Sequence, residues 1–83
     1  MGKKVENIYW NGRSVGTLTG PSVDMFDYYG LWTPCTDENL YTSFLEAVQM
    51  EGGTLVAIGD SSSDLVGTVE ELPSDELQIK LRC

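Results

Sequence analysis

Histidine is absent from the 83-residue chain, and cysteine is scarce. Because histidine is the commonest general base near neutral pH and the commonest metal ligand, its absence argues against most acid–base catalysis and against a histidine-bound metal ion. The two cysteines, Cys35 and Cys83, are too few for a disulfide framework and are not spaced as a CxxC site. We expect two free thiols, since nothing in the sequence directs the chain to an oxidising compartment.

Positive charge is also scarce. Five basic residues stand against 13 acidic ones, which gives a formal net charge of −8. Residues 14–79 contain no lysine or arginine, and every acidic residue except Glu6 lies in that stretch. Such a surface repels phosphate, so direct binding of nucleic acid and of anionic membranes is disfavoured. An acidic surface fits a protein that resists association, or one that meets a basic partner.

Long apolar runs are missing as well. No segment approaches the roughly 20 apolar residues that a membrane span requires, and no apolar stretch follows Lys3 and Lys4 as a signal peptide would need. The length and the 41% hydrophobic content predict one small globular domain over residues 1–83. We expect a cytoplasmic protein of microbial type that does not bind membranes.

The start of the chain carries a strong hairpin signal. Asn11-Gly12 separates two apolar segments, residues 5–10 and 13–19, and this dipeptide favours a two-residue hairpin turn. A regular register would place Trp10 opposite Arg13 and Ile8 opposite Val15. It would also pair Val5 with Leu18.

A helix is predicted next, followed by strands. Thr36 or Asp37 is the expected N-cap, Gly52-Gly53 ends the helix, and apolar residues recur at helical spacing between them: Leu40, Phe44, Leu45 and Val48. Residues 54–58, 65–72 (with Gly67 as a bulge or bend) and 76–82 read as three strands. These elements predict an α+β fold: one mainly antiparallel sheet of about five strands in ββ-α-βββ order, with one helix packed on one face.

Residues 20–35 form an unusually long connection in this scheme, and they contain most of the aromatic side chains. One interpretation is that the segment folds back as a minor core, with a helical turn from Ser22. The other is a binding surface in which aromatic anchors are edged by carboxylates. Both can hold if Phe26 and Trp32 are buried and at least one tyrosine is exposed. The candidate partner surface is therefore Asp24, Met25, Asp27, Tyr28 and Tyr29.

Catalytic motifs are not convincing. Ile58 to Ser63 resembles the nucleophile block of the GDSL hydrolases, but the serine of that family needs a histidine base, which this chain lacks. Asp60 and Asp64 lack the spacing of a calcium-binding loop, and no glycine-rich segment has the spacing of a phosphate-binding loop. We therefore expect no catalytic residue, no cofactor and no metal ion.

Two function classes remain. The first is a non-catalytic protein-interaction or accessory module that binds a protein partner through the aromatic segment, residues 23–32, and the exposed edge of the helix. The alternative is an acidic inhibitor that mimics nucleic acid, or an immunity protein that neutralises a basic enzyme. Carboxylates spaced like phosphates along one face would favour the alternative, whereas an uncovered aromatic patch would favour the first.

Overall fold

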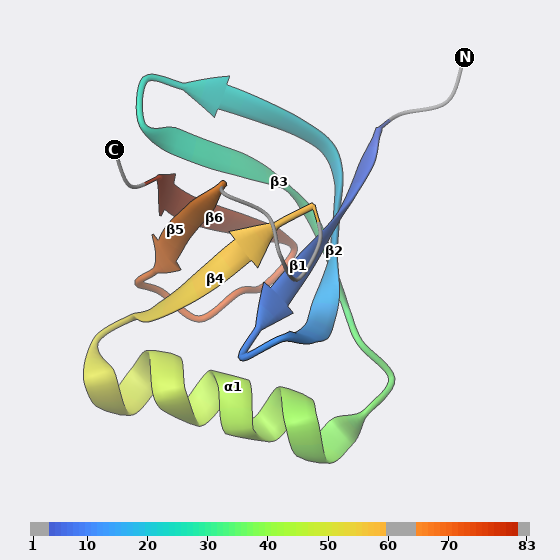
Figure 1. The fold of residues 1–83 in the computed structure, drawn as a ribbon, viewed down its shortest axis with the longest axis vertical. Coiled ribbons are helices and arrows are strands. Elements are labelled where there is room, and N and C mark those ends of the chain that lie inside the picture. Colours follow the sequence, from blue (N-terminus) through green and yellow to red (C-terminus); the bar gives the residue numbers. More distant parts are fainter. Residues whose placement is uncertain (1–3, 60–64, 82–83) are drawn as a thin grey trace.

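The computed structural model describes residues 4–59 and 65–81, in which six strands and one helix are found (Figure 1). The elements are β1 (Val5–Trp10), β2 (Arg13–Asp24), β3 (Asp27–Pro34), α1 (Glu38–Glu51), β4 (Thr54–Ile58), β5 (Val66–Val69) and β6 (Glu76–Leu81).

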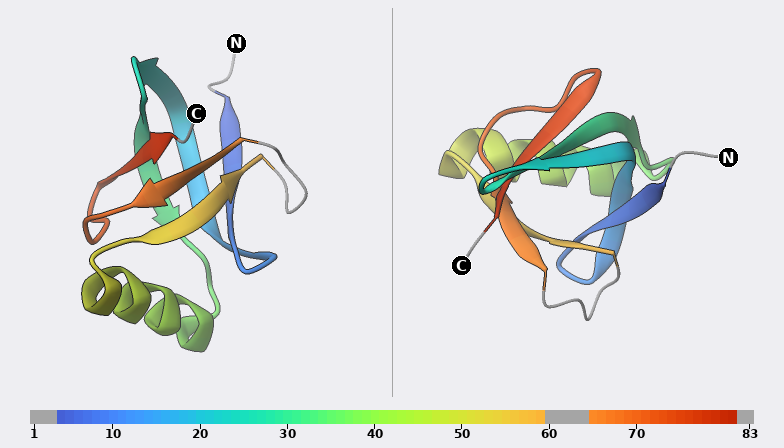
Figure 2. Two further views of the ribbon diagram at one scale, coloured as in Figure 1. Left: turned by 60° about the vertical axis from the view of Figure 1, so that its left-hand side comes forward. Right: turned by 90° about the horizontal axis from the view of Figure 1, so that it is seen from above.

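All strand pairs are antiparallel, and the sheet closes into a barrel in the order β1-β2-β3-β6-β5-β4 (Figure 2). Each half of the chain supplies a meander of three strands, and α1 connects the two meanders. The seams between the halves are β3 with β6 and β1 with β4. The predicted antiparallel sheet and the single helix are confirmed. The predicted ββ-α-βββ order of about five strands becomes βββ-α-βββ with six strands, the sheet is closed, and the helix covers one end of the barrel rather than one face of an open sheet.

The additional strand comes from the segment predicted to be a connection with a helical turn. Residues 20–24 extend β2, and residues 27–34 form β3. Along β3 the buried positions Tyr28, Gly30 and Trp32 alternate with outward-facing ones, which is the period of a strand. The turn prediction was wrong because Gly20-Pro21 does not end β2. A bulge between Thr19 and Ser22 absorbs these two residues instead.

The first hairpin forms at Asn11-Gly12 with Trp10 opposite Arg13, as predicted. Further from the turn the predicted register is wrong by one residue, since Ile8 pairs with Gly16 and Val15 is an extra residue in β2. Beyond this bulge, each side chain of β2 points to the opposite face of the sheet from the one that the regular register predicts. The apolar residues that the regular register distributed over two faces therefore share the barrel interior: Ile8, Val15 and Leu18, each fully buried.

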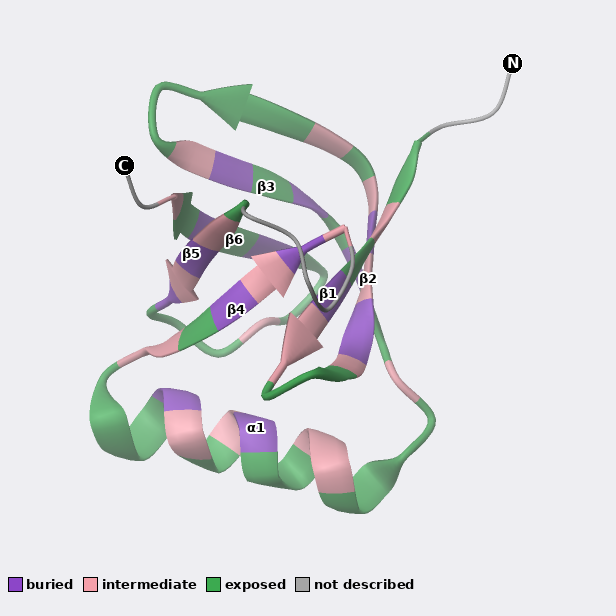
Figure 3. Cartoon of the chain, viewed as in Figure 1, coloured by how far each residue is buried: buried purple, intermediate pink, exposed green. Residues whose placement is uncertain are grey.

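Helix α1 has the predicted limits. Asp37 is the N-cap, and its Oδ1 accepts a hydrogen bond from the Leu40 backbone N–H at 3.1 Å. Gly52 ends the helix in the left-handed conformation, with φ of 69°. The helix lies across one end of the barrel, where β1 and β3 finish and β4 begins (Figures 1 and 2). Phe44 and Val48 are buried, and the buried positions of α1 lie on its side toward the barrel (Figure 3).

Aromatic rings fill the space between α1 and the barrel. The Phe44 ring lies 5.8 Å from that of Trp10, edge to face, and 6.5 Å from that of Trp32. Both indoles have hydrogen-bond partners: Trp32 Nε1 donates to Tyr41 Oη at 3.0 Å, and Trp10 Nε1 donates to Thr54 Oγ1 at 2.9 Å. The aromatic side chains thus cap the barrel with their polar atoms satisfied.

The second meander has the three predicted strands, but β5 covers only Val66–Val69 of the predicted residues 65–72. Leu77 and Ile79 of β6 point into the core, as their alternation predicts. Gly67 pairs in regular register, so it does not form the predicted bulge. A Cβ there would clash with Ile79 and with the backbone of Lys80, so glycine is needed for close packing. The motif residues 60–64 and Cys83 lie outside the described residues, and Cys35 is a free thiol.

Candidate partner surface

Several apolar side chains are exposed at the end of the β2–β3 hairpin. Asp24 pairs with Asp27, and the two-residue turn between them consists of Met25 and Phe26. Met25 is 84% exposed and Phe26 is 55% exposed. Met25 also has a φ of 59°, a conformation that costs a non-glycine residue about 1–2 kcal/mol. The turn thus presents two apolar side chains to solvent on a strained backbone.

We call residues Val23–Tyr29 the hairpin tip. Tyr29 points outward from β3 and is 39% exposed, and Val23 is also exposed. Tyr28 is different, because its side chain points into the barrel and is only 7% exposed. The structure therefore removes Tyr28 from the surface on which it was predicted. It also corrects the expected burial of Phe26, since the turn lies beyond the barrel rim.

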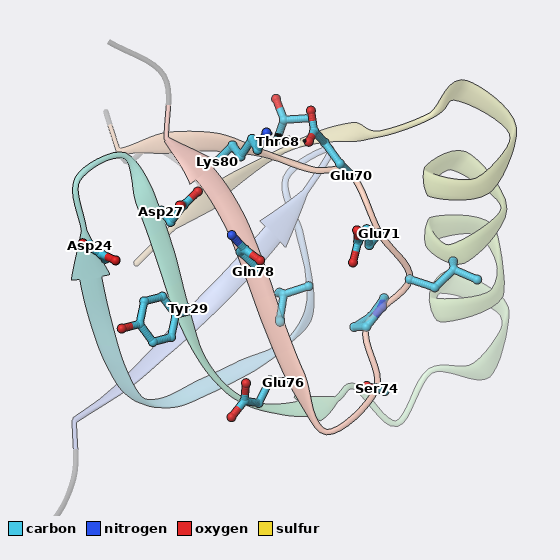
Figure 4. Close-up of a pocket in the computed structure, with 13 residues that line it drawn as sticks. Asp24, Asp27, Tyr29, Thr68, Glu70, Glu71, Ser74, Glu76, Gln78 and Lys80 are labelled. Atoms are coloured by element: carbon cyan, nitrogen blue, oxygen red, sulfur yellow. Dashed lines mark ion pairs between the residues drawn. The ribbon is translucent and has the colours of Figure 1, made fainter.

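A groove of about 590 Å³ adjoins the hairpin tip (Figure 4). Its floor is the outer face of β6, where Gln78 and Lys80 alternate with the buried Leu77 and Ile79. One wall is the hairpin tip, and the other is the connection formed by residues 70–75. Strand pairing aligns the floor with the first wall, since Tyr29 lies opposite Gln78 and Asp27 lies opposite Lys80.

The groove is strongly acidic, and we call it the acidic groove. Among the described residues that line it, Lys80 is the single basic one, and Lys80 Nζ lies 3.2 Å from Glu70 Oε2. Five carboxylates against one ammonium give a net charge of −4 for the lining: Asp24, Asp27, Glu70, Glu71 and Glu76. The sequence shows the acidic residues near position 70, but it contains no signal that they face Asp24 and Asp27.

The pKa values of Lys4 and Tyr28 are both raised. Lys4 Nζ lies 2.9 Å from Glu6 Oε1, and this hydrogen bond, together with the charge of Glu6, raises the pKa of Lys4. Burial raises the pKa of Tyr28, and the negative charge of Glu6 adds to the effect. Tyr28 is therefore a neutral phenol near pH 7, and its side chain packs in the core.

A second, shallower hollow of about 570 Å³ lies between the β1–β2 turn and the start of α1. Arg13 Nη2 and Asp37 Oδ2 lie 3.7 Å apart beside it, and both side chains are largely exposed. Exposed ion pairs contribute little to stability. Across residues 4–59 and 65–81, no group of three or more cysteine, aspartate or glutamate side chains is placed to hold a metal ion.

Comparison with known proteins identifies no relative. No family model matches the sequence, and neither the curated proteins nor the solved structures include a significant match. In the part of the chain that the structure describes, no helix is long and apolar enough to cross a membrane.

Proposed function

We propose that this protein is a non-catalytic protein-interaction module that binds its partner through the hairpin tip. The observation that carries the proposal is the exposure of Met25 and Phe26 on adjacent positions of one turn. Apolar side chains that are exposed together gain free energy when a partner removes them from water. Large apolar and aromatic residues are also the side chains that dominate binding energy at protein interfaces.

The position of the tip on the barrel supports the proposal. Its two strands continue into β2 and β3, which pair with β1 and β6, respectively. The closed sheet thus holds the tip in place before binding. The tip therefore loses little conformational entropy when a partner binds. The strained φ of Met25 also supports the proposal, because strained backbone conformations cluster at functional sites.

The test compares the tip with an equally exposed apolar residue elsewhere. The double variant Met25→Ser/Phe26→Ser removes the apolar turn, and Met50→Ser on α1 is the matched control, since Met50 is 83% exposed. Wild-type and variant proteins are used to capture partners from cells of the source organism, and affinities are then measured on the purified partner. We expect the double variant to weaken binding by about tenfold or more, and the control to bind like wild type. Equal binding by all three proteins would refute the proposal.

The acidic inhibitor of a basic enzyme is the second candidate, and the net charge of −8 together with the acidic groove favours it. Binding of this kind depends on charge rather than on the apolar turn. It predicts that the complex survives Met25→Ser/Phe26→Ser but weakens steeply when the salt concentration rises to about 0.3 M. The two candidates are therefore separated by the same set of variants.

A further inference from the structure

The hairpin tip and the acidic groove form one continuous surface. Asp24, Asp27 and Tyr29 belong to the tip and also line the groove (Figure 4). A partner that covers Met25 and Phe26 therefore comes within reach of the groove carboxylates. The chemistry of the groove then determines which partners can bind.

The floor of the groove is long enough for an extended peptide. Its floor follows β6, a strand of six residues, which corresponds to a length of about 20 Å. Carboxylates occur along its length and on both walls: Asp24 and Asp27 on the hairpin, Glu70 and Glu71 on the connection, and Glu76 at the start of β6 (Figure 4). The negative charge is thus spread over both walls and one end of the floor and does not converge on one point.

Most of these carboxylates have no ion-pair partner among the described residues. Lys80 pairs with Glu70, whereas Asp24, Asp27, Glu71 and Glu76 take part in none of the described ion pairs. Asp24 and Asp27 also lie directly opposite each other in the sheet, an arrangement in which like charges repel. A cationic side chain between them would relieve this repulsion.

We propose that the occupant of this surface is an extended segment of a partner protein that carries lysine or arginine side chains beside an apolar one. The cationic side chains lie between the carboxylates of the two groove walls, and the apolar side chain packs against Met25 and Phe26. The inference rests on the proposed function, because it names the partner chemistry of the same surface. Charge complementarity selects a cationic segment. The uncharged turn at Met25 and Phe26 selects, in addition, a segment with an apolar side chain, which a simple polycation lacks.

Three synthetic peptides test the proposal on the full chain. The first repeats Lys-Leu-Ser, the second replaces each leucine by serine, and the third replaces each lysine by glutamate. Each is titrated into isotopically labelled protein, and the backbone amide signals are followed by NMR. We expect the first peptide to shift the signals of Phe26, Tyr29 and Gln78, to bind more tightly than the second, and to weaken as salt rises from about 0.02 M to about 0.3 M. The third peptide should not bind.

Two charge variants locate the interaction. Asp24→Asn/Asp27→Asn removes two groove carboxylates and also removes a repulsive pair, so the hairpin should remain folded. Glu38→Gln/Glu46→Gln, on exposed positions of α1, is the control with the same change in net charge. We expect the groove variant to weaken binding of the first peptide by about fivefold and the control variant to leave it nearly unchanged. An equal effect of both variants would show that only net charge matters, and would overturn the proposal.

The outcomes for the two proposals are distinct. If the captured partner requires Met25 and Phe26 but the lysine peptides cause no shifts in the groove, the interaction module stands and the cationic segment is refuted. If the partner binds independently of the hairpin tip, the proposed function fails. Strong binding of the lysine–serine peptide without leucine would likewise refute the joint use of tip and groove.

Discussion

Phe44 is the side chain on which the attachment of α1 to the barrel depends most. It is fully buried, and its ring contacts those of Trp10, Trp32 and Tyr41. Truncation to alanine loses about 1.5–3 kcal/mol of hydrophobic transfer free energy, and the lost ring contacts and the residual cavity add to this. We therefore expect Phe44→Ala to lower the free energy of unfolding by about 3–5 kcal/mol.

Urea unfolding measures this change, with circular dichroism reporting the fold and tryptophan fluorescence reporting the aromatic cluster. A domain of this size has a total stability near the low end of about 5–15 kcal/mol, so the alanine variant lies close to unfolding. Phe44→Leu keeps most of the volume and provides a folded comparison with a loss of about 1–1.5 kcal/mol. Leu55→Ala is the control at a 46% exposed apolar position, where the loss should stay below about 1 kcal/mol.

Two results would refute the reasoning. If Phe44→Ala changed the unfolding free energy by less than about 1 kcal/mol, the face of α1 that packs on the barrel would not be the one described. If Leu55→Ala destabilised the protein as strongly as Phe44→Ala, burial at the barrel end would not be the cause.

Three further changes test other parts of the structure. A Cβ at Gly16 would lie 2.5 Å from the Thr33 carbonyl oxygen and 2.5 Å from the Trp32 ring, so Gly16→Ala should destabilise the fold by about 2–3 kcal/mol in urea unfolding. Met25→Gly relieves a positive φ at an exposed turn and should stabilise the fold by about 0.5–1 kcal/mol; a lower Tm would contradict this. Because the folded-state pKa of Tyr28 is raised above its unfolded value of about 10, the stability that it contributes is complete below that pH and is lost as pH rises through the folded pKa. Unfolding free energy should therefore fall at alkaline pH, and Tyr28→Phe should flatten this decline more than the control Tyr29→Phe does.

Local signals in the sequence determined the elements that depend on neighbours in the chain. The turn at Asn11-Gly12 needs only two residues that tolerate positive φ, and both adopt it, with φ of 54° and 80°. Helix α1 begins at the cap Asp37 and ends at Gly52, and its apolar stripe identifies the buried face. These elements were predicted correctly because the residues that determine them lie close together in the sequence.

The third strand could not be identified in this way. Aromatic and apolar side chains occupy both faces of β3, with Trp32 inside and Tyr29 and Leu31 outside, so the strand period is hidden in the composition. The bulge at Val15 is likewise invisible, since it depends on how β1 and β2 twist within the closed barrel. Barrel closure itself rests on the pairing of β1 with β4 and of β3 with β6, which join residues far apart in the chain.

The sequence by itself determined how much negative charge the protein carries and that the chemistry-bearing side chains are carboxylates, tyrosines and methionines rather than histidines. Only the tertiary structure decided where they gather. The pairing of β3 with β6 brings Asp27 opposite Lys80, and the β5–β6 connection then places Glu70 and Glu71 across the groove from the hairpin. Register decides this outcome, because a shift of one residue in β3 would turn Asp27 and Tyr29 into the barrel and bring Tyr28 to the surface.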